Sequence, residues 1–288
     1  MDLFSLFFTF YVEMLFNQSF RSEYTPCPIE DYVTCDGLIS SQTGVTLYTR
    51  PGIHTVRVGF FLDDRITTAS AGYMLGAAIT RMNKSLENSG VNIRVEVAFL
   101  QQVDIERYYS VDGDIRPVFF DFEDWQTKSP WRERKNVVFE NKADFIHLLL
   151  DNKVNWNACG VGRKFTGDNY PVGITACYGS HDIATWDPEQ TISTEYVLEH
   201  ELGHQFGLEH DEPNAMSQPF IEGGYGYQND PVYGSIMSYA KIRMPYYSNP
   251  DLTVKGIKNG SETANAARAL NAVAPKLSMN FEDNLRLE

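Results

Sequence analysis

Three of the six histidines in the chain stand close together, at His200, His204 and His210. Residues four apart in a helix lie one turn apart on the same face, so His200 and His204 can bind one ion together. His210 would face away if the helix continued. It can join the other two only if the chain turns sharply. Gly207 stands where that turn must occur, because glycine accepts left-handed backbone angles without steric cost.

This set of side chains predicts a catalytic zinc site, with His200, His204 and His210 as ligands. Three neutral imidazoles leave one coordination position open for a water, whose pKa zinc lowers to about 7. Glu201 lies beside the histidines and can take the proton of that water as general base, then pass it to the leaving amine. Two alternatives are an amphipathic helix with solvated histidines and a metal site without catalysis. The length of the pattern disfavours the first, and the presence of Glu201 disfavours the second.

The pattern H-E-x-x-H-x-x-G-x-x-H resembles the metzincin clan of zinc endopeptidases. The residues around Met237, G-S-I-M-S-Y, look like the methionine turn of that clan. Asp211 after the third histidine is similar to the adamalysin (reprolysin) branch. Residues 243–250 and 224–227 look most like the bacterial reprolysin-like and peptidyl-Asp metalloendopeptidases. The resemblance is detailed over roughly residues 173–275, and it implies a secreted zinc endopeptidase that hydrolyses peptide bonds in proteins.

The resemblance also implies roles for two residues after the methionine turn. Tyr239 follows Met237 at the spacing at which astacin-like and serralysin-like members bring a tyrosine to the metal, where its hydroxyl can stabilise an oxyanion. The adamalysin branch lacks that role, and the alternative is a core tyrosine. Arg243 is expected in or near the pocket for the side chain after the cleaved bond, where a guanidinium favours acidic residues. The alternative for Arg243 is an internal ion pair.

Substrate is expected to bind along an edge strand. Residues 173–177 precede the active helix at the distance expected of the metzincin edge strand. Ile174, Thr175 and Ala176 would then offer free backbone groups to an extended peptide. The alternative is an interior strand.

The surrounding elements predict the fold. Periodicity indicates strands at 56–62, 91–100, 157–164 and 173–178, and helices at 67–88, 139–153, 191–206 and 261–274. Residues 101–135 are expected to form an insertion loop or hairpin. This order predicts an α/β fold of zincin, metzincin type, with a mixed, mostly parallel twisted sheet, an active-site helix and a loop-rich C-terminal subdomain. We expect an N-terminal export or pro-like segment at 1–52 and the catalytic domain at 53–288.

The composition limits the classes of binding partner. The 288 residues carry a formal net charge of −14 and no basic cluster, which argues against nucleic acid and against anionic membrane surfaces. The apolar run at the N-terminus suits a signal-peptide core but is shorter than the ~20 residues of a membrane span. Export to the outside of the cell is therefore predicted, without stable membrane insertion. A misassigned start and an amphipathic segment are the alternatives, and the oligomeric state stays open.

The four cysteines are expected to form two disulfides, Cys27–Cys35 and Cys159–Cys177, as suits an exported protein. A sharper alternative makes Cys27 or Cys35 a latency thiolate on the zinc.

Protein and peptide substrates are the expected partners. Two other classes of function remain as alternatives, a zinc-bearing toxin-like or binding module and a metal amidase acting on a non-peptide substrate. The other histidines, His54, His147 and His181, have no ligand spacing and are expected to be surface or packing residues.

Overall fold

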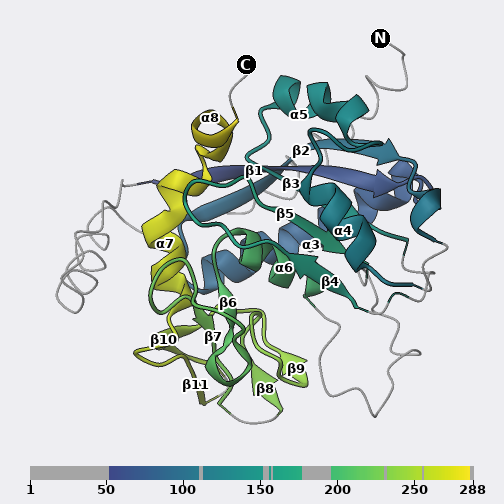
Figure 1. Ribbon diagram of the computed structural model, residues 1–288. Helices are drawn as coiled ribbons and strands as arrows, with labels where there is room; N and C mark the ends of the chain where they lie inside the picture. The colour runs from purple at the N-terminus through teal and green to yellow at the C-terminus, as the bar shows by residue number, and fades with distance from the viewer. Residues whose placement is uncertain are drawn as a thin grey trace.

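A five-stranded sheet forms the centre of the molecule (Figure 1). The computed structural model describes residues 52–109, 113–151, 156, 158–176, 196–229, 232–254 and 256–285. The strand order is β2-β1-β3-β5-β4. The parallel strands are β1 (His54–Asp63), β2 (Ile93–Val103), β3 (Phe145–Leu149) and β5 (Val172–Thr175), and β4 (Gly160–Gly162) runs antiparallel to β5. The predicted mixed, mostly parallel sheet is confirmed.

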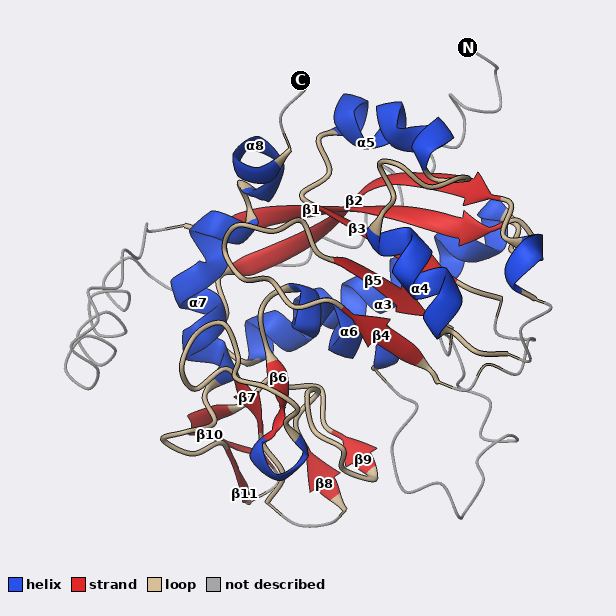
Figure 2. Cartoon of the chain, viewed as in Figure 1, coloured by secondary structure: helices blue, strands red, loops and turns tan. Residues whose placement is uncertain are grey.

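Helices cover both faces of this sheet (Figure 2). Buried side chains of α3 (Thr68–Asn88), α6 (Val197–Gln205) and α7 (Ala266–Leu277) share one apolar cluster with one face of the sheet. Those of α4 (Arg116–Glu123) and α5 (Lys135–Asn141) share a second cluster with the other face. Successive residues of a strand point to opposite faces, so Phe60 joins the first cluster and Phe61 the second.

The predicted helix at 139–153 is wrong. Helix α5 ends at Asn141, Lys142 takes a left-handed φ of 45°, and the chain then enters β3. All five residues of β3 are buried, because the strand lies in the middle of the sheet with helices on both sides. A short, continuous apolar run of this kind has no alternation, so its sequence does not distinguish a buried strand from a buried helix.

The expected loop or hairpin at 101–135 is also wrong. Strand β2 continues to Val103, and the chain then forms the short helix η1 (Glu106–Tyr108), α4 and the short helix η2 (Arg132–Arg134). Trp125 and Trp131 are buried in the second apolar cluster. This insertion therefore covers the second face of the sheet.

Strand β5 is an interior strand, which overturns the expected edge at residues 173–177. It pairs with β3 on one side and β4 on the other. Ile174, Thr175 and Ala176 are buried, so they present no free edge to a substrate. The edge is β4, a three-residue strand within the predicted stretch 157–164, and its two glycines give it no alternating pattern.

The chain after α6 is rich in loops, as predicted, and lies below that helix in Figure 1. It contains short paired strands and one short helix: β6 (Glu209–Asp211), η4 (Glu212–Asn214), β7 (Tyr225–Gly226), β8 (Tyr233–Gly234), β9 (Ile242–Arg243), β10 (Asn249–Val254) and β11 (Ile257–Asn259). Helices α7 and α8 (Asn280–Asn284) follow, and α7 packs against β1 and β2. No helix within the described residues is long and apolar enough to cross a membrane.

At the other edge of the sheet, a side chain pairs with the backbone of β2. The Asn83 amide of α3 donates to Val95 O at 2.9 Å, and the Val95 N–H donates to Asn83 Oδ1 at 2.8 Å. Asn83 thus satisfies one peptide unit in the middle of β2, as a neighbouring strand would.

Candidate metal centre

Helix α6 presents His200, Glu201 and His204 from a buried position. The opposite face enters the core as predicted, through Leu198, Leu202 and Phe206. Within the described residues the helix begins at Val197, because Tyr196 takes a left-handed φ of 58° and interrupts the helical backbone. Residues 191–195 lie outside the described residues.

Gly207 makes the predicted turn. Its φ is +94°, and a Cβ at this position would lie 2.9 Å from Phe220 Cβ. The N–H of Gly207 donates to His204 O at 2.8 Å, and the N–H of Leu208 donates to Gly203 O at 3.0 Å. These bonds close the end of the helix and send the chain into β6, which carries His210.

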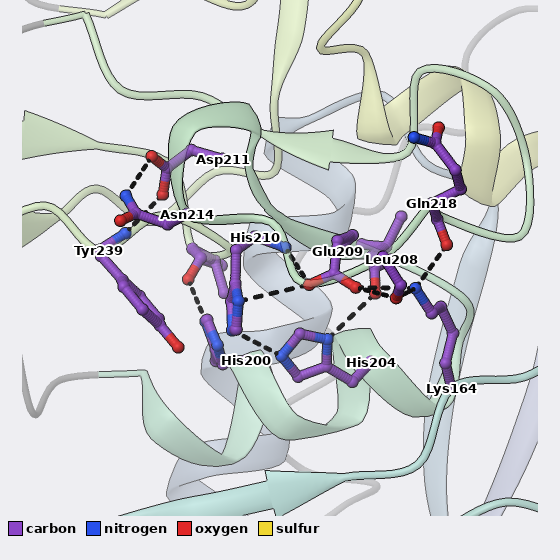
Figure 3. A network of polar contacts seen from close by, with 12 residues as sticks. Lys164, His200, His204, Leu208, Glu209, His210, Asp211, Asn214, Gln218 and Tyr239 are labelled. Atoms are coloured by element: carbon purple, nitrogen blue, oxygen red, sulfur yellow. Dashed lines mark hydrogen bonds and ion pairs between the residues drawn. The ribbon is translucent and has the colours of Figure 1, made fainter.

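The three histidines converge on one point (Figure 3). Their side chains offer ligand atoms that all lie within 4.8 Å of one another, and Nε2 of His204 is 3.0 Å from Nε2 of His210. The far nitrogens of two rings are anchored, since Nδ1 of His200 lies 2.8 Å from Ile236 O and Nδ1 of His204 lies 3.0 Å from Leu208 O. These bonds leave the Nε2 atoms facing inward.

This donor set fits zinc. Burial lowers the pKa of all three rings below the ordinary histidine value, to about 4 for His204, so the imidazoles are neutral at pH 7. Neutral imidazole nitrogens in this arrangement are preferred zinc ligands. Within the described part of the chain, this is the one group of three or more histidine, cysteine or acidic side chains close enough to hold a metal ion.

Strand β4 lies directly against the side of α6 that carries Glu201. A Cβ on Gly160 would be 2.5 Å from Glu201 Cγ, and a Cβ on Gly162 would be 2.6 Å from Glu201 O. Only glycine permits this approach. Burial raises the pKa of Glu201 to about 8, while the charge of Arg243 opposes that rise. The sequence alone does not indicate the role of these two glycines, because it depends on a contact between distant segments.

Met237 packs beneath the histidines. It is fully buried, and a Cβ on Gly203 of α6 would lie 2.4 Å from its Sδ. Asp211 fastens the methionine turn to the third histidine, because its Oδ1 accepts the N–H of Tyr239 at 2.9 Å and its Oδ2 accepts the Asn214 amide at 2.7 Å. Gly203 is a further site residue that sequence reasoning missed.

Tyr239 stands beside the metal ligands (Figure 3). Its half-buried ring lies 4.2 Å from the His210 ring and 6.2 Å from the His200 ring, measured between centroids. Burial and the nearby Glu201 carboxylate raise the pKa of its phenol. The structure thus brings Tyr239 to the site, and its part in the chemistry stays a prediction.

Arg243 is more buried than a substrate-reading residue was expected to be. It is 5% exposed, and its Nε donates to Ser238 O at 3.1 Å. Burial lowers its pKa to about 10, and the negative charge of Glu201 opposes that shift. The guanidinium is therefore buried and close enough to the Glu201 carboxylate for their charges to interact, and its contact with substrate stays a prediction.

His147 is a packing residue, as expected. It is fully buried, its Nδ1 lies 2.6 Å from Gln205 Oε1, and its Nε2 lies 2.9 Å from Thr175 Oγ1. The Gln205 amide also donates to Ile146 O at 2.9 Å. This buried network ties the end of α6 to β3 and β5, and the sequence did not reveal it.

The predicted disulfides fall mostly outside the described residues. Cys159, next to β4, is disulfide-bonded. Cys27, Cys35 and Cys177 lie outside the described residues, as does His181, so both pairings stay predictions.

Comparison with known proteins agrees with this centre. Residues 74–211 match the metallo-peptidase family M12B, reprolysin-like. The peptidyl-Asp metalloendopeptidase of Pseudomonas aeruginosa is 23% identical over 218 residues, which are 68% of this chain and 34% of that protein. The chain thus spans about a third of the length of this curated relative.

A solved structure titled "Structure of a chaperone-substrate complex" contains a chain with the same fold. It superposes with a TM-score of 0.57 at 18% identity, over 79% of this chain and 36% of that one. The family match runs from α3 to the residue after the third histidine. The three converging histidines therefore lie inside the part of the chain that is similar to the reprolysin-like metallopeptidases.

Proposed function

We propose that this protein is a zinc-dependent endopeptidase that hydrolyses peptide bonds in proteins. The observation that carries the proposal is the convergence of three neutral imidazoles beside the buried carboxylate of Glu201. His200, His204 and His210 would hold the zinc. When bound by three imidazoles with one position open, zinc makes a water acidic, with a pKa of about 7, and polarises a carbonyl.

Glu201 supplies the proton transfer. Its carboxylate takes a proton from the attacking water, holds it, and gives it to the amine that leaves. Burial alone favours the neutral acid. The positive charge of Arg243, and that of a dication among the histidines, favour the carboxylate that the reaction requires.

The edge of β4 suits the substrate. An extended peptide that adds to this edge lies beside Glu201, because Gly160 and Gly162 bring the strand against α6. This role replaces the one expected for residues 174–176. It also favours a peptide substrate over the small substrate of an amidase.

Two finer features belong to the proposal. The relative's name, peptidyl-Asp metalloendopeptidase, supports a preference for acidic residues in the substrate. Arg243 is the candidate to recognise them, because its positive charge acts on the site at Glu201. A peptide series with Asp or Leu after the cleaved bond, run on wild type and Arg243→Leu, tests this preference.

Export is supported by the disulfide bond at Cys159, since disulfides persist in oxidising compartments.

The test of the function is Glu201→Gln. This variant keeps all three predicted ligands, so we expect it to retain zinc while casein cleavage falls by roughly 100-fold or more. His204→Ala should lose the metal and the activity together. Metal analysis of each purified protein checks the first point, and cleavage rates check the second.

The same experiment separates the alternatives. A wild type that binds zinc and cleaves neither casein nor peptides would favour the binding module. Hydrolysis of small amides without cleavage of proteins would favour the amidase. Unchanged cleavage by Glu201→Gln would remove Glu201 from the mechanism.

A further inference from the structure

The far nitrogens of the three histidines face different partners. Those of His200 and His204 face the neutral backbone carbonyls of Ile236 and Leu208. Nδ1 of His210 lies 3.3 Å from Oε1 of Glu209, a carboxylate that is 4% exposed. One ligand of the site therefore faces an anion.

Both oxygens of the Glu209 carboxylate are held in place (Figure 3). Oε1 accepts the N–H of His210 at 3.0 Å. Oε2 accepts the Lys164 ammonium at 2.7 Å and the Ser217 hydroxyl at 2.8 Å. These contacts fix the carboxylate beside the imidazole, with its charge balanced by Lys164.

Lys164 comes from the segment between β4 and β5. Besides Glu209, its ammonium contacts Ser217 Oγ at 2.6 Å and the backbone carbonyl of Gln218. A single cation thus connects the end of the edge strand, the carboxylate and the segment that follows the third histidine.

We propose that Glu209, held by Lys164, is a positioning residue for His210, and accepts the Nδ1 proton of that ring when Nε2 binds the metal. This inference rests on the proposed zinc site. A carboxylate partner fixes the ring orientation and the tautomer, and makes the imidazole a stronger ligand. Partners of this kind change metal affinity by roughly 10- to 100-fold.

A competing acceptor exists. Nδ1 of His210 completes no hydrogen bond to a described residue, and the backbone of Asn214 is also close enough to raise the pKa of the ring. The two acceptors give different results on mutation. A side-chain substitution at Glu209 removes the carboxylate and leaves the backbone of Asn214 available.

The experiment measures zinc affinity by competition with a chromophoric chelator, at one pH, for wild type, Glu209→Gln, Lys164→Met and the double variant. We expect Glu209→Gln to weaken zinc binding by about 10- to 100-fold. Lys164→Met should weaken it less, and the double variant should match Glu209→Gln, because Lys164 acts through Glu209. Glu212→Gln is the matched control, since it removes an exposed charge from the same segment, where Glu212 contacts Thr263.

Thermal unfolding of the metal-free proteins distinguishes two roles of Glu209, which are positioning of the His210 ring and stabilisation of the loop. If Glu209 only braces the loop, Glu209→Gln lowers the unfolding temperature without changing zinc affinity, which overturns the inference. Zinc affinity lowered as much in Glu212→Gln as in Glu209→Gln overturns it as well. A wild type that binds no zinc overturns the proposed function itself.

Discussion

The ring of Tyr239 lies against two of the three imidazoles, with its backbone fixed by Asp211. This placement suits a hydroxyl that stabilises negative charge on a carbonyl oxygen during hydrolysis. It equally suits a ring that only packs beside His210.

Tyr239→Phe distinguishes these roles because it removes the hydroxyl and keeps the ring. If the hydroxyl stabilises the oxyanion, kcat should fall by about 100-fold, the usual effect of losing one such donor. KM and zinc content should change little. A variant with the kcat of wild type would leave Tyr239 a packing residue.

Residues with a local pattern were the ones that the sequence predicted well. The helical spacing of His200 and His204, and the need for a turn at Gly207, follow from backbone geometry alone. Glu209 and Lys164 were missed because they are distant in the sequence and meet only in the fold. Charged residues of this kind are common on surfaces, so neither one indicates a buried site.

At the scale of elements, helix α6 is positioned by close contacts at glycines, where a side chain would not fit. Gly162 of β4 faces the backbone oxygen of Glu201, and Gly203 of α6 faces Met237. The helix is therefore held between the edge strand and the methionine turn at distances that a methyl group would change.

Gly162→Ala should reduce activity strongly. Its new Cβ would lie 2.6 Å from Glu201 O and 2.9 Å from His204 Cβ, and the helix backbone cannot rotate away as a side chain could. We expect kcat/KM to fall by more than about 10-fold and the free energy of unfolding to fall by about 1–3 kcal/mol, as for overpacking in a core. Peptide cleavage and denaturant unfolding measure the two effects.

Gly76→Ala is the matched control for this change. Gly76 lies within α3, and a Cβ there meets nothing within 4 Å. Alanine should stabilise this helix by about 0.5–1 kcal/mol and leave kcat/KM unchanged. If Gly162→Ala behaved in the same way, the close packing of β4 on α6 would be incorrect.

Elements with strong hydrophobic periodicity are predicted well from the sequence. Fully buried elements, whose residues are apolar without alternation, are not. Strand β1 and helix α3 lie close to their predicted ranges. The sequence of β3 predicts a helix, and the edge of the sheet is β4 where the sequence predicts β5. Strand order depends on pairing between distant segments, which a single sequence does not record.

At the scale of the whole molecule, acid should weaken the fold through His147. Burial lowers its pKa to about 4, from the ordinary histidine value of 6.5. Between these two pH values the unfolded chain binds a proton that the folded protein does not. The contribution of His147 to the free energy of unfolding is therefore fully present above pH ~6.5, and it is lost as the pH drops toward 4. Asp144 has the opposite pH dependence, because burial raises its pKa to about 6. The folded protein then keeps a proton that the unfolded chain loses, so the contribution of Asp144 to stability increases as the pH falls through this range.

Comparison with His147→Gln isolates this contribution, since the other groups are common to both proteins. At pH 7 wild type should be the more stable. Its advantage should shrink by up to about 3 kcal/mol by pH 4.5, at 1.36 kcal/mol for each pKa unit. Urea unfolding with a chelator present, which removes the effect of metal loss, measures the difference. An advantage that is constant with pH would assign the acid sensitivity to other groups.

The contact between Asn83 and Val95 has a consequence for assembly. Edge strands invite other copies of a protein to join them, and a sheet with two open edges can polymerise without limit. Here the backbone of a second copy could pair with β4, whereas a copy that pairs with β2 would first have to displace the Asn83 amide from Val95. Asn83→Ala would remove this obstacle, and we expect the variant to associate through β2 more readily than wild type.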